Sequence, residues 1–224
     1  MADNTSRLGA SYATPEILAY LEAKHAPMDA ALRYAFEAPT RHPIPAIHLG
    51  QHEANFLGWL LRLINAQKVV EVGTLAGFSG IHLARALPAS GHLYTCEREP
   101  HHADAARDAF EQAGLASKIT VVLGDARPSL AAIAGEGPFD AIFIDADKGG
   151  YEHYVTWAAE NLREGGLLLG DNVFFFGRLL TDEPEAQSMR RFHDIAAKHF
   201  ETCLLPTPDG LLLGWKKSKP SDTK

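Results

Sequence analysis

Two carboxylates and a carboxamide, each placed just after an apolar segment, form the most specific chemical pattern in this 224-residue chain. Asp145 follows the apolar run that ends at Ile144, and Asp171-Asn172 follows the next apolar run. If these runs are neighbouring parallel strands, the side chains meet at the edge of the sheet where ligands bind. Oxygen ligands suit a hard divalent cation such as Mg²⁺, Mn²⁺ or Ca²⁺, whereas zinc favours thiolate and imidazole.

Each of these acids also has an ordinary structural explanation, because Asp and Asn favour turns and tolerate a positive φ. A polar turn would account for Asp171-Asn172 alone, but it explains the pattern poorly once Asp145 is included. An acid lies at or near the end of every one of the five expected parallel strands: Glu71, Glu97, Asp125, Asp145 and Asp171.

A glycine-rich turn earlier in the chain predicts a second kind of site. The segment Val69–Gly80 leads from an apolar strand through Gly73 and Gly77 to Ser79, where a helix begins. Glycines let a ligand approach the backbone, and a helix N-terminus attracts polar or anionic groups such as a carboxylate. The G-x-x-x-G spacing differs from the G-x-G-x-x-G of dinucleotide enzymes and favours S-adenosylmethionine. Glu97 follows at the position where an acid accepts hydrogen bonds from ribose hydroxyls.

The hydrophobic pattern indicates how these residues are positioned. Short apolar runs alternate with helical patterns, which predicts a parallel sheet covered by helices on both faces. The expected strands are residues 68–73, 92–97, 119–123, 139–144 and 167–169. We expect two short helices within residues 15–38. The later helices are expected at 53–64, in a segment that ends at 87, and at 103–113, 130–134 and 151–162. Two final strands, 202–205 and 211–215, are joined by so few residues that they must be antiparallel. The predicted fold is therefore α/β, a doubly wound, Rossmann-like sheet that ends in an antiparallel hairpin, as in class I methyltransferases.

Length and composition narrow the class of protein. We expect one domain, with N-terminal helices and a loop in residues 1–52, the core in 53–217 and a disordered tail in 218–224. The formal charge of −7 argues against a nucleic-acid or anionic-membrane partner. No apolar run approaches the roughly 18 residues of a membrane span, and no signal peptide is recognisable. Cys96 and Cys203 lack a metal or redox spacing, so we expect both to be reduced core residues of a cytoplasmic protein.

On these residues the sequence closely resembles the cation-dependent O-methyltransferases, which include catechol and caffeoyl-CoA O-methyltransferases, and especially their small bacterial members. The resemblance covers about residues 47–215. It is carried by Glu71-Val72-Gly73-Thr74, Gly77-Phe78-Ser79, Asp145-Ala146-Asp147-Lys148, Tyr151, Tyr154, Gly165-Gly166 and Asp171-Asn172.

The resemblance implies a role for each matching residue. The metal ion would be held by Asp145, Asp171 and Asn172. The S-adenosyl-L-methionine site would be lined by Leu49, Glu71, Gly73, Thr74, Ser79, Glu97, Asp125, Ala126, Asp145 and Asp147. Lys148 would stand near the hydroxyl of a small phenolic acceptor, either catechol-like or hydroxycinnamoyl-type. The resemblance also implies a homodimer, with the N-terminal helices as its interface.

The chain departs from this family in two segments that border the acceptor. Gly50-Gln51-His52-Glu53 keeps Glu53 but changes its neighbours, and Val173 to Gly177 replaces the usual Trp and small or polar residue. The identity of the acceptor therefore stays open. The three aromatic residues Phe174–Phe176 could equally form a wall for a planar acceptor or belong to the core.

Several alternatives remain at this stage. Lys148 could act as a general base if its pKa were lowered from the usual ~10.4, or it could stabilise a phenolate electrostatically. A nicotinamide dehydrogenase predicts G-x-G-x-x-G and no carboxylate cluster. A nucleic-acid N-methyltransferase predicts an Asn/Asp-Pro-Pro-aromatic run after the fourth strand, where this chain has Asp145-Ala146-Asp147-Lys148. A non-catalytic binding protein with the same fold is the third alternative.

Overall fold

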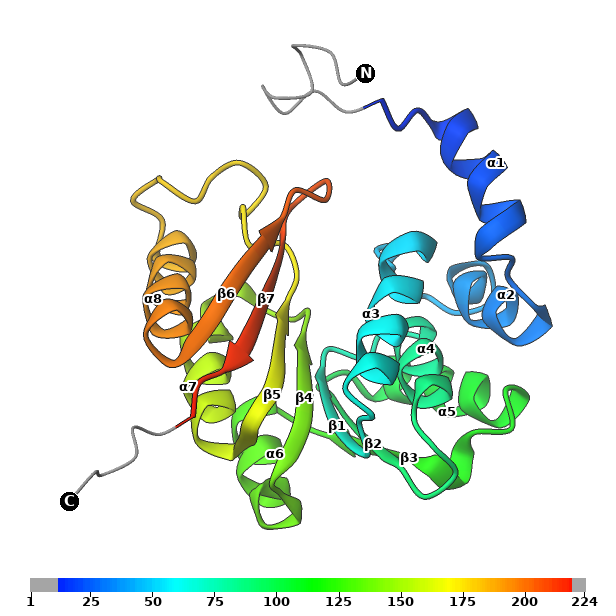
Figure 1. The fold of residues 1–224 in the computed structure, drawn as a ribbon. Helices are drawn as coiled ribbons and strands as arrows, with labels where there is room; N and C mark the ends of the chain where they lie inside the picture. The colour runs from blue at the N-terminus through cyan, green and yellow to red at the C-terminus, as the bar shows by residue number, and fades with distance from the viewer. Residues whose placement is uncertain (1–11, 219–224) are drawn as a thin grey trace.

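A seven-stranded sheet forms the centre of the protein (Figure 1). The structure is a computed structural model and describes residues 12–218, so the predictions for the first residues and for 219–224 lie outside the described part. The strand order is β3-β2-β1-β4-β5-β7-β6. The strands are β1 (Lys68–Val72), β2 (His92–Glu97), β3 (Ile119–Leu123), β4 (Phe139–Ile144), β5 (Leu162–Gly170), β6 (Phe200–Leu205) and β7 (Leu211–Lys216).

The pairing of the strands confirms the predicted topology. Strands β1 to β5 are parallel, whereas β7 runs antiparallel beside β5 and β6 runs antiparallel beside β7. The first strand lies between β2 and β4, so the chain changes its direction of winding at β1. The switch point, where such sheets bind ligands, is therefore the crevice beyond the carboxyl ends of β1 and β4.

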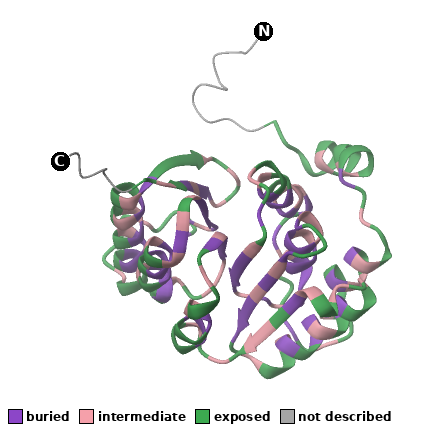
Figure 2. Cartoon of the chain, turned by 60° about the horizontal axis from the view of Figure 1, so that its bottom comes forward, coloured by how far each residue is buried: buried purple, intermediate pink, exposed green. Residues whose placement is uncertain are grey.

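Helices cover both faces of the sheet and create two separate apolar cores. One face is packed by α3 (Gln51–Leu63), α4 (Phe78–Ala86) and α5 (Pro100–Gln112), and the other by α6 (Ala126–Ile133), α7 (Tyr151–Asn161) and α8 (Pro184–His199). Alternate side chains of β4 pack into the two cores on opposite faces of the sheet. Phe143 belongs to one core, and Ile142 and Ile144 belong to the other. Figure 2 shows the buried residues concentrated on the central strands, with exposed residues on the outer faces of the helices. The strand ends are thus held rigidly from both sides.

Some boundaries differ from the sequence prediction. Helix α8 was not predicted, because the residues it buries are few and widely spaced among charged ones: Ala186, Ser188, Met189, Phe192 and Ala196. Strand β5 begins at Leu162 and continues through Gly165-Gly166, where the prediction placed a break. The register between β4 and β5 is irregular at this point, which lets the strand accommodate the two glycines.

The N-terminal helices α1 (Pro15–His25) and α2 (Ala30–Phe36) confirm the prediction of two short helices. They differ in packing, because α2 buries Leu32 and Ala35 whereas α1 buries no residue within the described chain. Within residues 12–218, none of the helices combines the length and the apolar character that crossing a membrane requires.

The two cysteines lie in different environments. Both are free, and Cys96 on β2 is buried as expected. The prediction of a core position for Cys203 was wrong, since its side chain is exposed. The reason is that Cys203 lies on β6, the edge strand of the sheet, where residues 201–204 are all exposed.

Candidate active site

A cavity of about 730 Å³ lies beyond the carboxyl ends of the parallel strands, at the predicted switch point. This volume is within the range of roughly 300–1,000 Å³ that is common for small-molecule sites. Nearly all of the site residues predicted from the sequence line it: Leu49, Gly73, Thr74, Ser79, Glu97, Asp125, Ala126, Asp145, Asp147, Lys148, Asp171 and Asn172. The exception is Glu71, which lies behind the cavity wall.

The glycine turn lets the strand ends pass close to one another. Gly73 has a φ of +100°, and a Cβ atom built on it would lie 1.9 Å from the backbone oxygen of Asp145. Gly77 has a φ of +81° at the start of α4, and its Cβ would lie 2.7 Å from the ring of Phe110. Only glycine satisfies the conformation and the space at both positions. The turn therefore presents bare backbone to the cavity.

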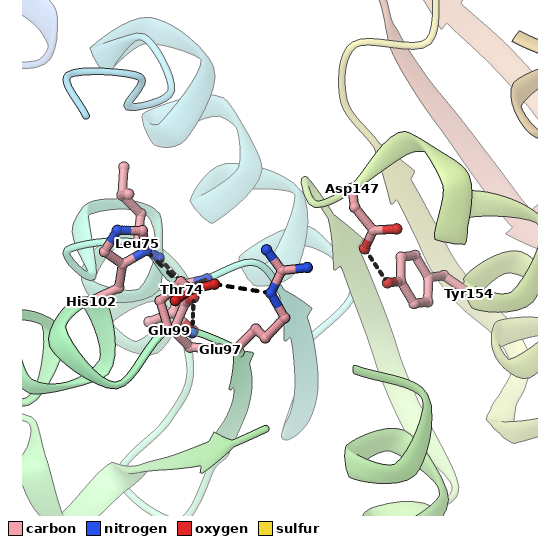
Figure 3. Close-up of polar contacts among 8 residues, drawn as sticks. Thr74, Leu75, Glu97, Glu99, His102, Asp147 and Tyr154 are labelled. Carbon is pink, nitrogen blue, oxygen red and sulfur yellow. Dashed lines mark hydrogen bonds and ion pairs between the residues drawn. The ribbon is translucent and has the colours of Figure 1, made fainter. Parts of the chain in front are cut away.

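Glu97 ties together two loops that border the cavity (Figure 3). Its Oε2 accepts hydrogen bonds from the backbone N–H of Leu75 at 2.9 Å and of Thr74 at 3.2 Å, and its Oε1 accepts one from Glu99 N–H at 2.9 Å. Leu75 has a φ of +48°, which is unfavourable for a non-glycine residue. The carboxylate of Glu97 thus stabilises a strained turn and still lines the cavity.

His102 is a cavity residue that the sequence analysis did not select. Its Nδ1 lies 3.5 Å from Oε1 of Glu97, and its side chain is only 15% exposed (Figure 3). The contact joins the first turn of α5 to the end of β2. No sequence motif includes this histidine, and only the fold places it beside Glu97 at the cavity.

Glu71 supports the cavity wall from behind. Its carboxylate is fully buried and accepts hydrogen bonds from the hydroxyls of Ser79 at 2.5 Å and Thr95 at 2.6 Å. The Thr95 hydroxyl lies 2.5 Å from that of Thr74, which faces the same turn. Burial raises the pKa of Glu71 to about 7, in spite of these hydrogen bonds. Glu71 therefore reaches the cavity only through Ser79 and Thr95-Thr74.

Two of the three predicted metal ligands, Asp145 and Asn172, contact one cationic group in the structure, the side-chain amine of Lys148. Its Nζ lies 2.7 Å from Oδ1 of Asn172 and 3.3 Å from Oδ1 of Asp145. The hydroxyl of Tyr151 accepts a third hydrogen bond from Nζ at 2.9 Å and donates one to the backbone oxygen of Asp171 at 2.8 Å. The oxygen atoms of two strand ends are thus already arranged around a positive charge.

The electrostatics at these strand ends also fit a cation. Asp171 is buried, and burial together with the charge of Asp145 raises its pKa to about 7. A positive charge beside Asp171 would favour its ionised form. Within residues 12–218 no group of three or more His, Cys, Asp or Glu side chains forms a possible metal site. The set at these strand ends instead has two carboxylates and the carboxamide of Asn172, which are donors that fit a hard divalent ion.

Asp147 and Tyr154 form a second polar pair at the cavity. The Tyr154 hydroxyl donates a hydrogen bond to Oδ1 of Asp147 at 2.6 Å (Figure 3), and burial and this bond raise the pKa of the phenol. A Cβ atom on Gly150 would lie 2.3 Å from the Tyr154 hydroxyl, so the glycine makes room for it. The hydrogen bond from the tyrosine holds the carboxylate of Asp147 at the cavity wall.

The three consecutive phenylalanines have different environments, although the sequence left their role open. Phe175 is buried and belongs to the core, whereas Phe176 is 60% exposed and lines the cavity mouth. Both have a φ of +52°, at a cost on the order of 1 kcal/mol for each non-glycine residue. Phe175 therefore confirms the expectation of a core residue, whereas contact of Phe176 with an acceptor stays a prediction.

The rest of the mouth is formed by the segment before α3 and by the turn between β6 and β7. Ile47, His48, Pro208 and Asp209 line it. His48 packs on the ring of Phe78, with ring centroids 6.1 Å apart, and burial lowers its pKa. This side of the cavity is largely apolar, in contrast to the carboxylate-rich floor.

A doubly wound sheet of this strand order, with a glycine turn after β1 and an acid after β2, defines a class I methyltransferase that uses S-adenosylmethionine. The sequence profile of the O-methyltransferase family matches residues 23–217. The chain belongs to this family of S-adenosylmethionine-dependent O-methyltransferases.

Two curated relatives are catechol O-methyltransferases. The protein from Niastella koreensis is 41% identical over 170 residues, which cover 74% of this chain and 77% of the relative. The protein from Mycobacterium tuberculosis is 37% identical over 187 residues, which cover 83% and 84%. The fold also matches a crystal structure of the O-methyltransferase from Bacillus cereus in complex with SAH, with a TM-score of 0.86 at 33% identity over 90% of this chain and 97% of that one.

The buried Glu71 predicts a pH-dependent stability. Its pKa in the folded state, about 7, lies above the ordinary value of 4.5, so its contribution is complete below pH 4.5 and is lost as the pH rises to about 7. Glu71→Gln removes this titration. Across that range, the unfolding free energy of the wild type should fall relative to that of the variant by on the order of 3 kcal/mol.

Urea denaturation of both proteins across this pH range measures the difference. Glu111→Gln, on the exposed face of α5, is the matched control and should leave the pH dependence unchanged. Parallel curves for wild type and Glu71→Gln would show that the carboxyl of Glu71 titrates normally.

Proposed function

We propose that this enzyme transfers a methyl group from S-adenosylmethionine to one hydroxyl of a small catechol-like phenol, and that a divalent cation assists. The observation that carries the proposal is the convergence of Asp145 and Asn172 on the Lys148 ammonium, beside the buried Asp171. The names of the relatives, catechol and caffeoyl-CoA O-methyltransferases, support a phenolic acceptor.

The charges around the cavity support a free phenol rather than a CoA thioester. The cavity is lined by eight carboxylates and by three Lys or Arg side chains: Glu53, Glu97, Glu99, Asp125, Asp145, Asp147, Asp171, Asp209, Arg98, Arg127 and Lys148. At the mouth, the charged side chain beside Ile47, His48, Phe176 and Pro208 is the acidic Asp209. The phosphates of CoA would need Lys or Arg there. A cationic sulfonium and a metal ion suit the acidic floor.

In the proposed complex, the carboxylate of Glu97 would accept hydrogen bonds from the ribose hydroxyls of S-adenosylmethionine, and Asp125-Ala126 would lie beside its adenine ring. Ser79, at the start of α4, lies near the carboxylate of the cofactor, and Leu49 contributes backbone contact. The cofactor supplies an electrophilic methyl group on a sulfonium. These residues would hold that group in line with the acceptor oxygen, which is the positioning component of catalysis.

A phenol has a pKa near ~10, so the site has to stabilise its anion. Asp145, Asp171 and Asn172 would hold a divalent cation, which lowers the pKa of a hydroxyl that it contacts. Lys148 Nζ contacts three oxygen atoms, those of Asp145, Asn172 and Tyr151, and so is not free to take a proton from an acceptor. We therefore propose that Lys148 stabilises the phenolate by its charge, while general-base catalysis is the alternative.

The first test of this function is metal-dependent methylation. Purified protein with S-adenosylmethionine, Mg²⁺ and a catechol should produce a monomethyl ether. Activity should vanish after chelation and return with Mg²⁺. Asp171→Ala should lose activity but still bind S-adenosylhomocysteine in calorimetry, since its role is toward the metal. Methylation that survives complete removal of divalent metal would contradict the mechanism, and preference for a hydroxycinnamoyl-CoA ester would contradict the acceptor class.

Two variants distinguish the roles of Lys148. Lys148→Met removes both charge and base, and should lower kcat by about 10²- to 10³-fold. Lys148→Arg keeps a permanent charge but cannot accept a proton, so the electrostatic role predicts substantial residual activity. Steady-state kinetics at saturating S-adenosylmethionine provide the comparison. Equal loss in both variants would instead support Lys148 as the general base.

We also propose a homodimer in which the N-terminal helices lie at the interface. Helix α1 has a side-chain N-cap from Thr14 but packs no buried residue against the described chain. An isolated helix of 11 residues is marginal in water, so a partner is needed to order it. Its Ile17, Tyr20 and Leu21 are exposed, as is Trp59 on α3. Together they provide an apolar surface for a second copy.

The dimer is tested by light scattering coupled to size exclusion. Wild type should elute with twice the chain mass, and Tyr20→Asp should shift the protein towards monomer because a charge enters the apolar interface. Leu180→Asp is the control, since Leu180 is highly exposed on the loop before α8. A monomeric wild type, or an unchanged mass for Tyr20→Asp, would refute the proposed interface.

A further inference from the structure

An unusual stretch of backbone lies between the proposed metal ligand Asn172 and Gly177. Of the five non-glycine residues with a positive φ in the described chain, three are found here: Asn172, Phe175 and Phe176, at +52° to +55°. Gly177 follows at +75°. Residues in this conformation persist only where surrounding contacts hold them, and such residues cluster at functional sites.

Three of the hydrogen bonds that hold this segment come from the turn between β6 and β7. Backbone N–H groups of Val173 and Phe174 donate to the backbone oxygens of Gly210 and Asp209, at 3.1 and 3.0 Å. The N–H of Phe176 donates to Oδ1 of Asp209 at 2.8 Å. This last bond is the one made by a side chain, and it joins residues 33 positions apart.

The ends of the strained segment are anchored independently. The guanidinium of Arg178 lies 4.4 Å from the centre of the buried Phe175 ring, and the ring of Phe174 packs where a side chain on Gly210 would stand. Phe176 itself is largely exposed, so packing contributes little to its position. Backbone hydrogen bonds within the turn hold its neighbours, and the bond to Asp209 is the one that the N–H of Phe176 itself makes.

Phe176 is also the aromatic side chain at the cavity mouth nearest in sequence to Asn172, and it lines the cavity together with Ile47 and Pro208. Phe176 and Lys148 line the same cavity. A planar phenol seated between this ring and Lys148 would have its two hydroxyls placed by the ring.

We propose that Asp209 is a positioning residue for the acceptor: its carboxylate locks Phe176 in place and thereby sets which hydroxyl of a catechol is methylated. The inference rests on the proposed function for the identity of the acceptor. The hydrogen bond between Asp209 and Phe176 does not depend on that function. Oδ2 of Asp209 is buried and has no hydrogen-bond partner within residues 12–218, so the contact with Phe176 is made by Oδ1 alone.

The test compares Asp209→Ala with Asp209→Asn in the full-length protein. The amide oxygen of the Asn variant can still accept from Phe176 N–H, whereas Ala cannot. Hydrogen–deuterium exchange of a peptide spanning residues 172–178 should be faster in Asp209→Ala and restored towards wild type in Asp209→Asn. This readout needs neither metal nor cofactor.

The functional arm measures KM for the acceptor, KM for S-adenosylmethionine and the ratio of the two monomethyl products of an asymmetric catechol. Asp209→Ala should raise the acceptor KM by about five-fold, the value of one net hydrogen bond, and move the product ratio towards equality. KM for S-adenosylmethionine should stay unchanged. Phe176→Leu keeps the N–H but replaces the ring, so it should alter the product ratio while exchange stays at the wild-type rate.

Exchange and product ratio that are unchanged in Asp209→Ala would overturn the proposal. If Asp209→Ala fails to fold, Phe176→Leu still decides it, because an unchanged product ratio in that variant excludes control by the ring. If wild type methylates no catechol, the proposed function fails, and the exchange rates still show whether Asp209 locks the segment.

Discussion

The close approach of Gly73 to the backbone oxygen of Asp145 is the contact on which the rest of the site depends. A single methyl group at residue 73 would meet that oxygen at 1.9 Å, so the ends of β1 and β4 can adjoin only with glycine between them. Two backbone hydrogen bonds continue the sheet beyond these strand ends. Asp145 N–H donates to the backbone oxygen of Val72, and Asp171 N–H donates to that of Ile144. The glycine turn after β1 and the acidic ends of β4 and β5 therefore share one frame.

This frame concentrates negative charge at a considerable electrostatic cost. Glu71 and Asp171 are buried, and the pKa of each is raised to about 7 because burial penalises the charged form. Perturbed acids of this kind gather at functional sites, where the folded protein tolerates unfavourable charge for the sake of ligand binding. The positive charge of Lys148 lowers that cost at Asp171, and the sulfonium of the cofactor would add to it. The charge interactions that stabilise the folded protein at these acids are thus of the same kind as those that would bind a cationic ligand.

Much of this architecture could be predicted from the sequence, because strands buried on both faces read as apolar runs and their ends carry glycines and acids. The predictions failed where the outcome depends on contacts between distant segments. Glu71 was expected to line the cavity, but its strand position turns the side chain inward to Thr95. His102 and Asp209 carry no motif, and their importance follows from what they touch. Helix α8 was missed because its buried face is sparse.

Two segments line the cavity mouth: residues 173–177, in the connection from β5 to α8, and residues 206–210, which join β6 to β7. Neither contributes hydrogen bonds to the parallel strands β1–β4. Sequence changes there can accumulate without disturbing the frame around Gly73. If these loops select the acceptor as proposed, they form one exchangeable unit, because they are hydrogen-bonded to each other, and the strand ends that carry the site would stay unchanged.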